Sequence, residues 1–229
     1  MSRVPPAAPS QYEPIVGADA QLTQRVLAQV PGIYGQYLTY VKALRENGTL
    51  PRRLVELVRL RISFHNQCRT CMSVRYADAM EDGVTEALVC SLEKPQESDD
   101  LTAAEKTALA FADKFAPDHL SITDEQFAGL RDHFNDAEVM ELCFDVATFV
   151  GYGRMNAVLA MTDDLPGEYQ DDCAVLAPWH QGPHQVVLAV VVSSPRQTGS
   201  VALRQCPHFS TPPGKGGCHD RHCHDRRGG

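Results

Sequence analysis

Glu56 and the cysteine pair Cys68 and Cys71 are the residues of this chain whose types and spacing are best suited to chemistry. Two cysteines three positions apart on a helix face the same way and lie close enough to form a reversible disulfide. A carboxylate upstream on the same helical stretch is a candidate to accept or relay a proton for such a pair. The pattern therefore indicates thiol redox chemistry.

Activation of these thiols depends on their surroundings, because a free thiol with a pKa of ~8.5 is mostly protonated at neutral pH. Cys68 and Cys71 lie near an expected helix N-terminus, whose dipole favours the thiolate, and Arg75 is expected one helical turn after Cys71. An unbroken helix would place Glu56 about 18 Å from Cys68, too far for contact. Glu56 therefore reaches the thiols only if the chain turns sharply near 65–67 or another subunit supplies the carboxylate.

Helical patterns over about 20–165 must position these residues. The segment 33–46 repeats apolar residues at intervals of three and four and ends at an Asn-Gly stop signal. Pro51 opens a helix with apolar residues around its whole circumference, which indicates a buried central helix. Further helices are expected at 69–81, 85–92, 103–115, 124–134, 137–150 and 154–161.

Local signals mark the ends of several of these helices. Thr102, Thr123 and Asn135 are each followed three positions later by Glu or Gln, the pattern of a capping box. The Gly-Tyr-Gly sequence at 151–153 is expected to interrupt the last helical stretch. We see no convincing strand before residue 170.

Composition divides the chain into three parts. Residues 1–18 are rich in Pro, Ala and Ser and are expected to form a flexible arm, and residues 19–169 form one all-α domain. The tail 170–229 is rich in Pro, Gly, His and Arg, and only Gln185–Ser194 has the pattern of a strand, which cannot bury itself in isolation. The tail is therefore expected to be poorly ordered, either as a selected extension or as a readthrough or frameshift product.

Charge and hydropathy exclude several classes of protein. The net charge is -8 and the pI about 5.5, which argues against nonspecific nucleic-acid binding. The longest apolar run, Val186–Val192, is too short to cross a bilayer, and the first residues lack the apolar core of a signal peptide. We expect a cytoplasmic protein without membrane association, whose eight cysteines are free, metal-bound or catalytic rather than structural disulfides.

The stretch 51–81 resembles the core of the carboxymuconolactone decarboxylase / alkylhydroperoxidase D-like (AhpD-like) family. The redox branch of that family carries Glu-x11-Cys-x2-Cys-x3-His. Glu56, Cys68 and Cys71 match this motif position for position, and Arg75 stands where the family has histidine.

The resemblance extends loosely over about 30–165 and implies an AhpD-like all-α fold that assembles as a homo-trimer or homo-hexamer. It also implies hydroperoxide reduction or disulfide exchange without a bound cofactor. Cys71 would be the attacking thiol, Cys68 the resolving thiol and Glu56 part of a proton relay. An external dithiol, either a lipoyl group or a thioredoxin-like protein, would reduce the disulfide again.

Arg75 changes what this resemblance implies, because arginine does not deprotonate near neutral pH and cannot relay a proton. Arg75 could lower the pKa of Cys71 electrostatically, or it could form an ion pair at the surface or at a subunit interface. His65 is a candidate substitute relay, and its alternative role is to form hydrogen bonds at a helix end. Glu56 also has a simpler interpretation, as the partner of solvated ion pairs with Arg52, Arg53 or Arg59.

Other functions remain open at this point. One is a thiol-disulfide exchanger or redox sensor with little peroxidase turnover. Another is a carboxymuconolactone decarboxylase-like or non-enzymatic helical module in which the cysteines are structural. We expect no metal site in the helical domain, because no second Cys/His pair follows at zinc-finger spacing. The tail has a metal-binding composition, and its weak candidates are Cys218, His222 and Cys223.

Overall fold

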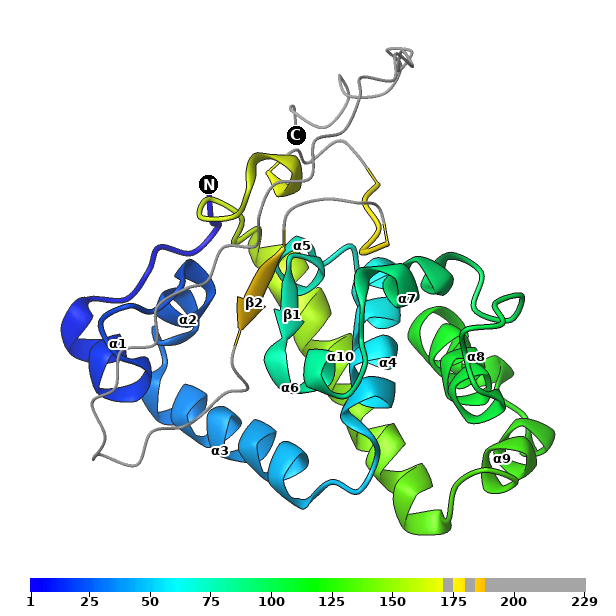
Figure 1. Cartoon of the computed structure of the whole chain (residues 1–229). Helices are drawn as coiled ribbons and strands as arrows, with labels where there is room; N and C mark the ends of the chain where they lie inside the picture. Colours follow the sequence, from blue (N-terminus) through cyan, green and yellow to red (C-terminus); the bar gives the residue numbers. More distant parts are fainter. Residues whose placement is uncertain (171–174, 180–183, 188–229) are drawn as a thin grey trace, which may run out of the picture. The chain divides into compact units, whose positions relative to one another are not determined.

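The computed structural model describes residues 1–170, 175–179 and 184–187 of the chain. The helices are α1 (Pro9–Val16), α2 (Leu22–Leu27), α3 (Pro31–Asn47), α4 (Arg52–His65), α5 (Arg69–Met72), α6 (Ala77–Glu81), α7 (Glu86–Cys90), α8 (Ala103–Asp118), α9 (Asp124–Arg131) and α10 (Asp136–Leu159), and the strands are β1 (Val74–Tyr76) and β2 (Gln185–Val187). Short 3-10 helices follow at Ser91–Glu93, His119–Ser121 and Gly167–Tyr169. Apart from the two short strands the domain is all-α, as predicted (Figure 1).

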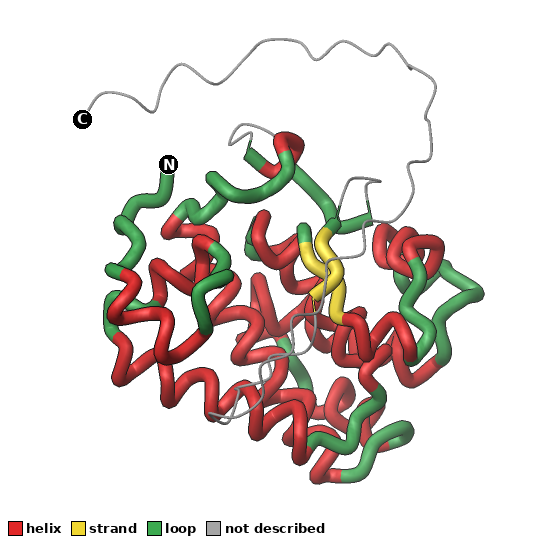
Figure 2. The backbone as a smooth tube through the Cα atoms, turned by 60° about the vertical axis from the view of Figure 1, so that its left-hand side comes forward, coloured by secondary structure: helices red, strands yellow, loops and turns green. Residues whose placement is uncertain are grey.

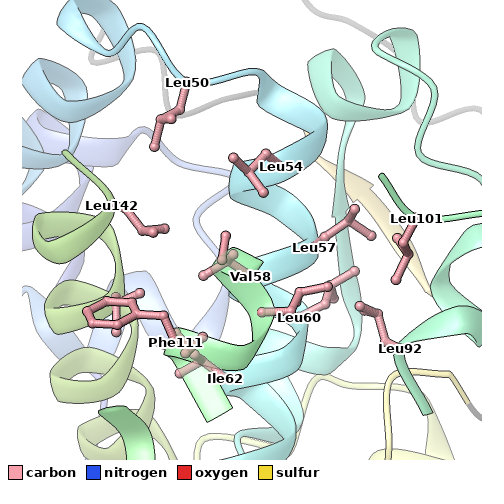
Figure 3. Close-up of a cluster of buried hydrophobic side chains, with 14 of the residues drawn as sticks. Leu50, Leu54, Leu57, Val58, Leu60, Ile62, Leu92, Leu101, Phe111 and Leu142 are labelled. Atoms are coloured by element: carbon pink, nitrogen blue, oxygen red, sulfur yellow. The ribbon is translucent and has the colours of Figure 1, made fainter. Parts of the chain in front are cut away.

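Helix α4 lies at the centre of the hydrophobic core and packs against both α8 and α10. Its side chains Leu57, Val58 and Ile62 are completely buried. Figure 3 shows Val58 and Ile62 on the side of Phe111 of α8 and Leu142 of α10, and Leu57 on the side of Leu101. Burial of each such side chain stabilises the fold by about 1.5–3 kcal/mol. Helix α4 is therefore a rigid support for the residues that follow its C-terminal end. The predicted central helix is confirmed.

Residues 1–18 contain a packed helix rather than a flexible arm. Tyr12 of α1 is buried, together with Ala7, in a small apolar cluster with Tyr34 and Leu38 of α3. Pro9 occupies the first helical position, where its missing N–H leaves no hydrogen bond unmade. The prediction of a flexible arm from composition was wrong, because proline is common both at helix starts and in unstructured segments.

The predicted capping boxes are present at the starts of α8, α9 and α10. In α8 the hydroxyl of Thr102 accepts from the Glu105 N–H at 3.2 Å, and the Glu105 carboxylate accepts from the Thr102 N–H at 2.8 Å. Each box satisfies two of the four N–H groups that a helix leaves unpaired at its start. Local signals therefore located these helix starts to within one residue.

The predicted break at 151–153 is wrong, because α10 continues through it to Leu159. Gly153 is buried against the side chain of Asn66, where a Cβ atom would lie 2.3 Å from Nδ2 of Asn66. The Asn66 amide in turn donates to the carbonyl of Phe149 at 2.9 Å. The glycine therefore allows α10 to approach the end of α4, and it does not end the helix.

The segment 69–81 is not one helix, and the expectation of no strand before residue 170 is wrong. The chain forms α5, then β1, then α6, and β1 pairs in parallel with β2. The strands lie side by side in Figure 2. A three-residue strand whose partner lies far along the chain leaves no local pattern to detect. The predicted strand at 185–194 is confirmed over Gln185–Val187, and its remainder lies outside the described residues.

No helix within the described residues combines the length and hydropathy needed to cross a membrane. Most of the predicted tail 170–229, including Cys218, His222 and Cys223, lies outside those residues. The described part of the tail, residues 175–179 and 184–187, contacts the helical domain: Leu176 and Trp179 pack against it and β2 pairs with it.

Candidate redox site

The chain reverses direction directly after α4, which is the first of the two ways in which Glu56 could reach the thiols. Asn66 caps α4, and Gln67 has a φ of +48°, in the left-handed region. The N–H of Cys68 then donates to the carbonyl of Ser63 at 3.0 Å, which folds the chain back over the end of α4. We call residues 66–73 the redox turn.

Cys68 and Cys71 form a disulfide within this turn, with 5.2 Å between their Cα atoms. Cys68 is the N-cap residue of α5, and its Sγ accepts from the Cys71 N–H at 3.2 Å. The two residues differ in accessibility, since Cys68 is fully buried and Cys71 is partly exposed. Cys71 is therefore the cysteine of the pair that lies nearer to the protein surface.

Glu56 is buried beside the redox turn and is neutralised by Arg59. The Glu56 carboxylate accepts from Nε of Arg59 at 2.6 Å and from Nη2 at 2.8 Å. Burial by itself lowers the pKa of Arg59, but the charge and hydrogen bonds of Glu56 raise that pKa by more, so it lies above its usual range. The predicted ion pair exists, but it is buried rather than solvated.

Arg59 links this ion pair to the redox turn. Its Nη1 donates to the carbonyl of Cys71 at 2.7 Å, and its Nη2 donates to the carbonyl of Val74 at 3.0 Å. The Tyr76 N–H donates to Glu56 at 3.4 Å. Glu56 thus contacts the turn through a guanidinium and through the backbone of β1, and the structure shows no hydrogen bond from its carboxylate to either sulfur.

Arg75 lies on β1, not one helical turn after Cys71 as expected. Its guanidinium forms a two-pronged ion pair with Glu86, at 2.8 and 3.1 Å, and donates to the carbonyls of Met72 and Pro178 at 2.8 and 2.9 Å. The side chain is only 2% exposed. Arg75 is therefore a buried structural residue whose hydrogen bonds go to neighbours other than the thiols.

His65 faces α8 rather than the disulfide. Its Nε2 lies 2.7 Å from Oδ1 of Asp113, and Nε of Arg61 donates to the same oxygen at 2.6 Å. Burial raises the pKa of Asp113, but the hydrogen bonds from His65 and Arg61 lower it by more, so it lies below its usual range. This arrangement matches the interpretation of His65 as a hydrogen-bonding residue at a helix end.

The structure therefore brings together Glu56, Cys68 and Cys71 and leaves Arg75 and His65 with other partners. Sequence reasoning missed Gln67, which has a left-handed backbone and whose side-chain amide donates to the carbonyl of Phe64 in α4 at 2.7 Å. It named Arg59 only as an ion-pair candidate, although its spacing of three from Glu56 was the available signal. Within the described residues there is no cluster of three or more Cys, His, Asp or Glu side chains that suits a metal ion.

Residues 31–114 match the sequence profile of the carboxymuconolactone decarboxylase family. The matched segment runs from α3 into α8 and contains the whole redox turn. The segment 31–114 is therefore similar to this family. The expected family resemblance is thereby confirmed, and it covers Glu56, both cysteines of the pair and Arg75.

Two uncharacterized bacterial proteins are similar in sequence to part of the chain. An uncharacterized protein of Mycobacterium tuberculosis is 37% identical over 93 residues, which cover 40% of this chain and 32% of that protein. The uncharacterized protein YdfG of Bacillus subtilis is 23% identical over 120 residues, covering 50% and 78% of the two chains. The chain therefore spans about a third of the length of its mycobacterial relative.

A solved structure has the same fold. It is an uncharacterized peroxidase-related protein from Ralstonia eutropha JMP134, described as an alkylhydroperoxidase AhpD core. The TM-score is 0.55 at 19% identity, and the match covers 65% of this chain and 78% of the other. At this identity the likeness establishes the AhpD-like helical fold alone.

Proposed function

We propose that this protein is a thiol-dependent oxidoreductase of the alkylhydroperoxidase type, which reduces hydroperoxides through Cys71 and Cys68. One observation carries the proposal. A segment similar to the carboxymuconolactone decarboxylase family holds a Cys68–Cys71 disulfide with one buried and one partly exposed cysteine. The AhpD-like fold and the peroxidase-related neighbour support it.

The proposed cycle has three steps. The Cys71 thiolate attacks the terminal oxygen of the hydroperoxide, the O–O bond breaks, and the leaving alkoxide takes a proton to become an alcohol, so that Cys71 becomes a sulfenic acid. The Cys68 thiol then attacks Sγ of Cys71 and expels water, which forms the disulfide. An external dithiol, either a lipoyl group or a thioredoxin-like protein, reduces that disulfide and becomes a disulfide itself.

Glu56 enters the proposal through Arg59. In the disulfide form Glu56 is the counter-ion that holds Arg59 against the carbonyl of Cys71. A proton relay through Glu56, as the family motif implies, requires that this ion pair open or that water join it to the thiols. The hydrogen bonds of Arg59 favour a different main role for the Glu56–Arg59 ion pair, which is to hold the redox turn in position.

The second candidate is a thiol-disulfide exchanger or redox sensor with little peroxidase turnover. It is favoured by Arg75, which stands where the family has histidine and cannot relay a proton. The guanidinium of Arg75 donates hydrogen bonds to Glu86 and to the Pro178 carbonyl. This candidate keeps the same disulfide and the same roles for Cys68 and Cys71. It differs in the oxidant, which would be another disulfide rather than a peroxide.

Consumption of hydroperoxide with a dithiol as reductant tests the proposal. The wild type is compared with Cys71→Ser, with Cys68→Ser, and with Cys90→Ser as a matched control at an exposed free cysteine. We expect turnover and the loss of two thiols on oxidation in the wild type and in Cys90→Ser, and no turnover in Cys71→Ser. Oxidation of the pair without turnover supports the exchanger. If the thiols react with neither a hydroperoxide nor a disulfide, Cys68 and Cys71 are structural. The family match then indicates the fold and not the activity.

We also propose that the protein is a cytoplasmic homo-oligomer, a trimer or a hexamer. Large apolar side chains are exposed on α3 and α10, among them Ile33, Met140, Phe144 and Val158. Met140 and Phe144 are four positions apart on α10, the spacing that places two side chains on the same face of a helix, and an apolar face of this kind suits burial against another subunit. Light scattering that finds only the monomer mass contradicts this part of the proposal.

A further inference from the structure

Residues 175–179 and 184–187, which we call the C-terminal cap, contact the redox turn on its upstream side. Gln67, directly before Cys68, exchanges two hydrogen bonds with Leu176. Its Nε2 donates to the Leu176 carbonyl at 3.1 Å, and its Oε1 accepts from the Leu176 N–H at 3.1 Å. Non-glycine residues rarely adopt the left-handed backbone found at Gln67. The same Nε2 also donates to the Phe64 carbonyl at 2.7 Å, so the Gln67 side chain joins the cap to the end of α4.

The cap also contacts the downstream side of the disulfide. The N–H of Gln185 donates to the carbonyl of Ser73 at 2.6 Å, and β2 continues the contact as a parallel pair with β1. Figure 1 shows both strands beside α5, the helix that carries Cys71. Leu176 packs with Met72, the residue after Cys71, in a small apolar cluster. The cap thus contacts the residue before Cys68 and the residues after Cys71.

Contacts of Arg75 and Trp179 attach the cap to the helical domain. Nη2 of Arg75 donates to the Pro178 carbonyl at 2.9 Å. The ring of Trp179 lies 4.7 Å from that of Phe64, and the Arg61 guanidinium lies 5.2 Å from the Trp179 ring. Trp179 is only 8% exposed. Phe64 and Arg61 belong to the last turns of α4, so the cap is attached to the same helix end that supports the redox turn.

We propose that the C-terminal cap restricts the Cys68–Cys71 disulfide to small dithiols and excludes protein-sized reductants. This inference rests on the proposed function and adds to it the class of the reductant. In the same scheme, the arginine at the position of the family histidine serves to anchor the cap.

The geometry of disulfide exchange explains why a cap selects by size. The thiolate of the reductant attacks Sγ of Cys71 on the side opposite Cys68, the disulfide bond breaks, and Cys68 leaves as a thiolate that takes a proton. The second thiol of the reductant then attacks the mixed disulfide, which releases the Cys71 thiolate and the oxidised reductant. A small dithiol needs only the exposed edge of Cys71, whereas a protein must also place the surface around its own thiol against the turn, where the cap lies on both flanks.

The test compares two reductants on the oxidised protein. Dithiothreitol is the small dithiol, and reduced thioredoxin is the protein-sized one. The rate of disulfide reduction by each is measured for the wild type, Arg75→Gln and Gln67→Asn. Asparagine tolerates a left-handed backbone but is too short to bridge to Leu176, so Gln67→Asn keeps the test open if Arg75→Gln does not fold. Arg131→Gln, which removes an exposed ion pair far along the chain, is the matched control.

Trp179 reports directly on the cap, because it is the one tryptophan of the chain. Quenching of its fluorescence by acrylamide is expected to increase in Arg75→Gln and Gln67→Asn and to stay unchanged in Arg131→Gln. Unchanged quenching in both cap variants overturns the assignment of Arg75 and Gln67 as its ties.

The reduction rates decide the proposal. We expect thioredoxin to reduce the two cap variants about tenfold faster than the wild type, with the dithiothreitol rates changed less than twofold. A rise of threefold or more in the thioredoxin-to-dithiothreitol ratio, in either variant, supports the size filter, and a smaller rise in both overturns it. The assay measures disulfide reduction alone, so an absence of peroxide turnover would refute the proposed peroxidase and leave this result standing.

Discussion

Arg59 donates a hydrogen bond of 2.7 Å to the carbonyl oxygen of Cys71. The two residues lie on opposite sides of the chain reversal after α4, so this bond fixes the redox turn to the central helix. The guanidinium also neutralises Glu56 within the same buried site. An ion pair that the sequence offers as a surface feature is therefore part of the support of the disulfide.

Removal of Arg59 tests this support. Arg59→Met leaves the Glu56 carboxylate buried without a counter-ion and deprives two carbonyls of the turn of their donor. Breaking one side of a buried pair typically costs about 3–5 kcal/mol. We expect a loss of that size in the free energy of unfolding, measured by urea denaturation. Arg131→Met, at an exposed ion pair, is expected to lose less than about 1 kcal/mol, and equal losses in the two variants would contradict the interpretation.

Glu56→Gln separates positioning from proton relay. If Glu56 mainly holds Arg59, the glutamine retains part of the hydrogen bonding, and we expect peroxide turnover to fall less than about tenfold with an unchanged pH profile of kcat/KM. General acid-base catalysis is typically worth about 10²–10⁴-fold. A loss in that range, together with the loss of one limb of the pH profile, would assign the relay to Glu56.

Arg75→His restores the family motif but is not expected to restore a relay. The arginine lies on β1 and serves Glu86, Met72 and Pro178 at once, and an imidazole ring is too small to reach all three. We expect peroxide turnover to rise less than about twofold and the unfolding free energy to fall by about 1–3 kcal/mol, the usual cost of unmade buried hydrogen bonds. A tenfold gain in turnover would show that histidine at this position reaches the thiols.

The sequence predicted the parts of the fold that depend on local signals. Capping boxes and apolar periodicity located α4, α8 and α9, and the Glu-x11-Cys-x2-Cys spacing identified the disulfide. Helix geometry offered a turn at 65–67 as one of two ways for Glu56 to reach Cys68, the other being a carboxylate from another subunit, since a straight helix keeps the two residues apart. These features are local because each one depends on residues within a few turns of one another.

The missed features depend on partners that are distant in sequence. The role of Arg75 at the cap could not be predicted because Pro178, its partner there, lies 103 positions away. Gly153 resembled a helix break because the neighbour that requires a glycine there, Asn66, lies 87 positions away, at the end of α4. The redox turn was located correctly, but its cap was not, because the cap is a short segment with little pattern of its own.

Asp145 makes stability depend on pH. Burial, and next the charge of Glu141, raise the pKa of Asp145 to about 7, against ~3.9 in an unfolded chain. Between these values the folded protein holds a proton that the unfolded chain releases, so the unfolding free energy falls as pH rises from about 4 to about 7. We expect Asp145→Asn to lack this decline and to be more stable than the wild type at pH 8, by about 2–4 kcal/mol.

Urea denaturation at pH 4.5 and pH 8 checks this expectation for Asp145. Asp132→Asn, at an exposed aspartate at the end of α9, is the control and should keep the wild-type difference between the two pH values. If Asp145→Asn also keeps that difference, Asp145 is ionised in the folded protein at both pH values.

Gly151 and Gly153, in the C-terminal half of α10, should respond to alanine in opposite directions. At Gly153 a Cβ atom would lie 2.3 Å from Nδ2 of Asn66, so alanine must displace the residue that caps α4 just before the redox turn. We expect Gly153→Ala to lower the unfolding free energy by about 1–3 kcal/mol. At Gly151 nothing lies within 4 Å of the same atom, and Gly151→Ala should stabilise the protein by about 0.5–1 kcal/mol, the helix propensity gain. Thermal unfolding measures both, and stabilisation of both variants would show that α10 can move away from Asn66.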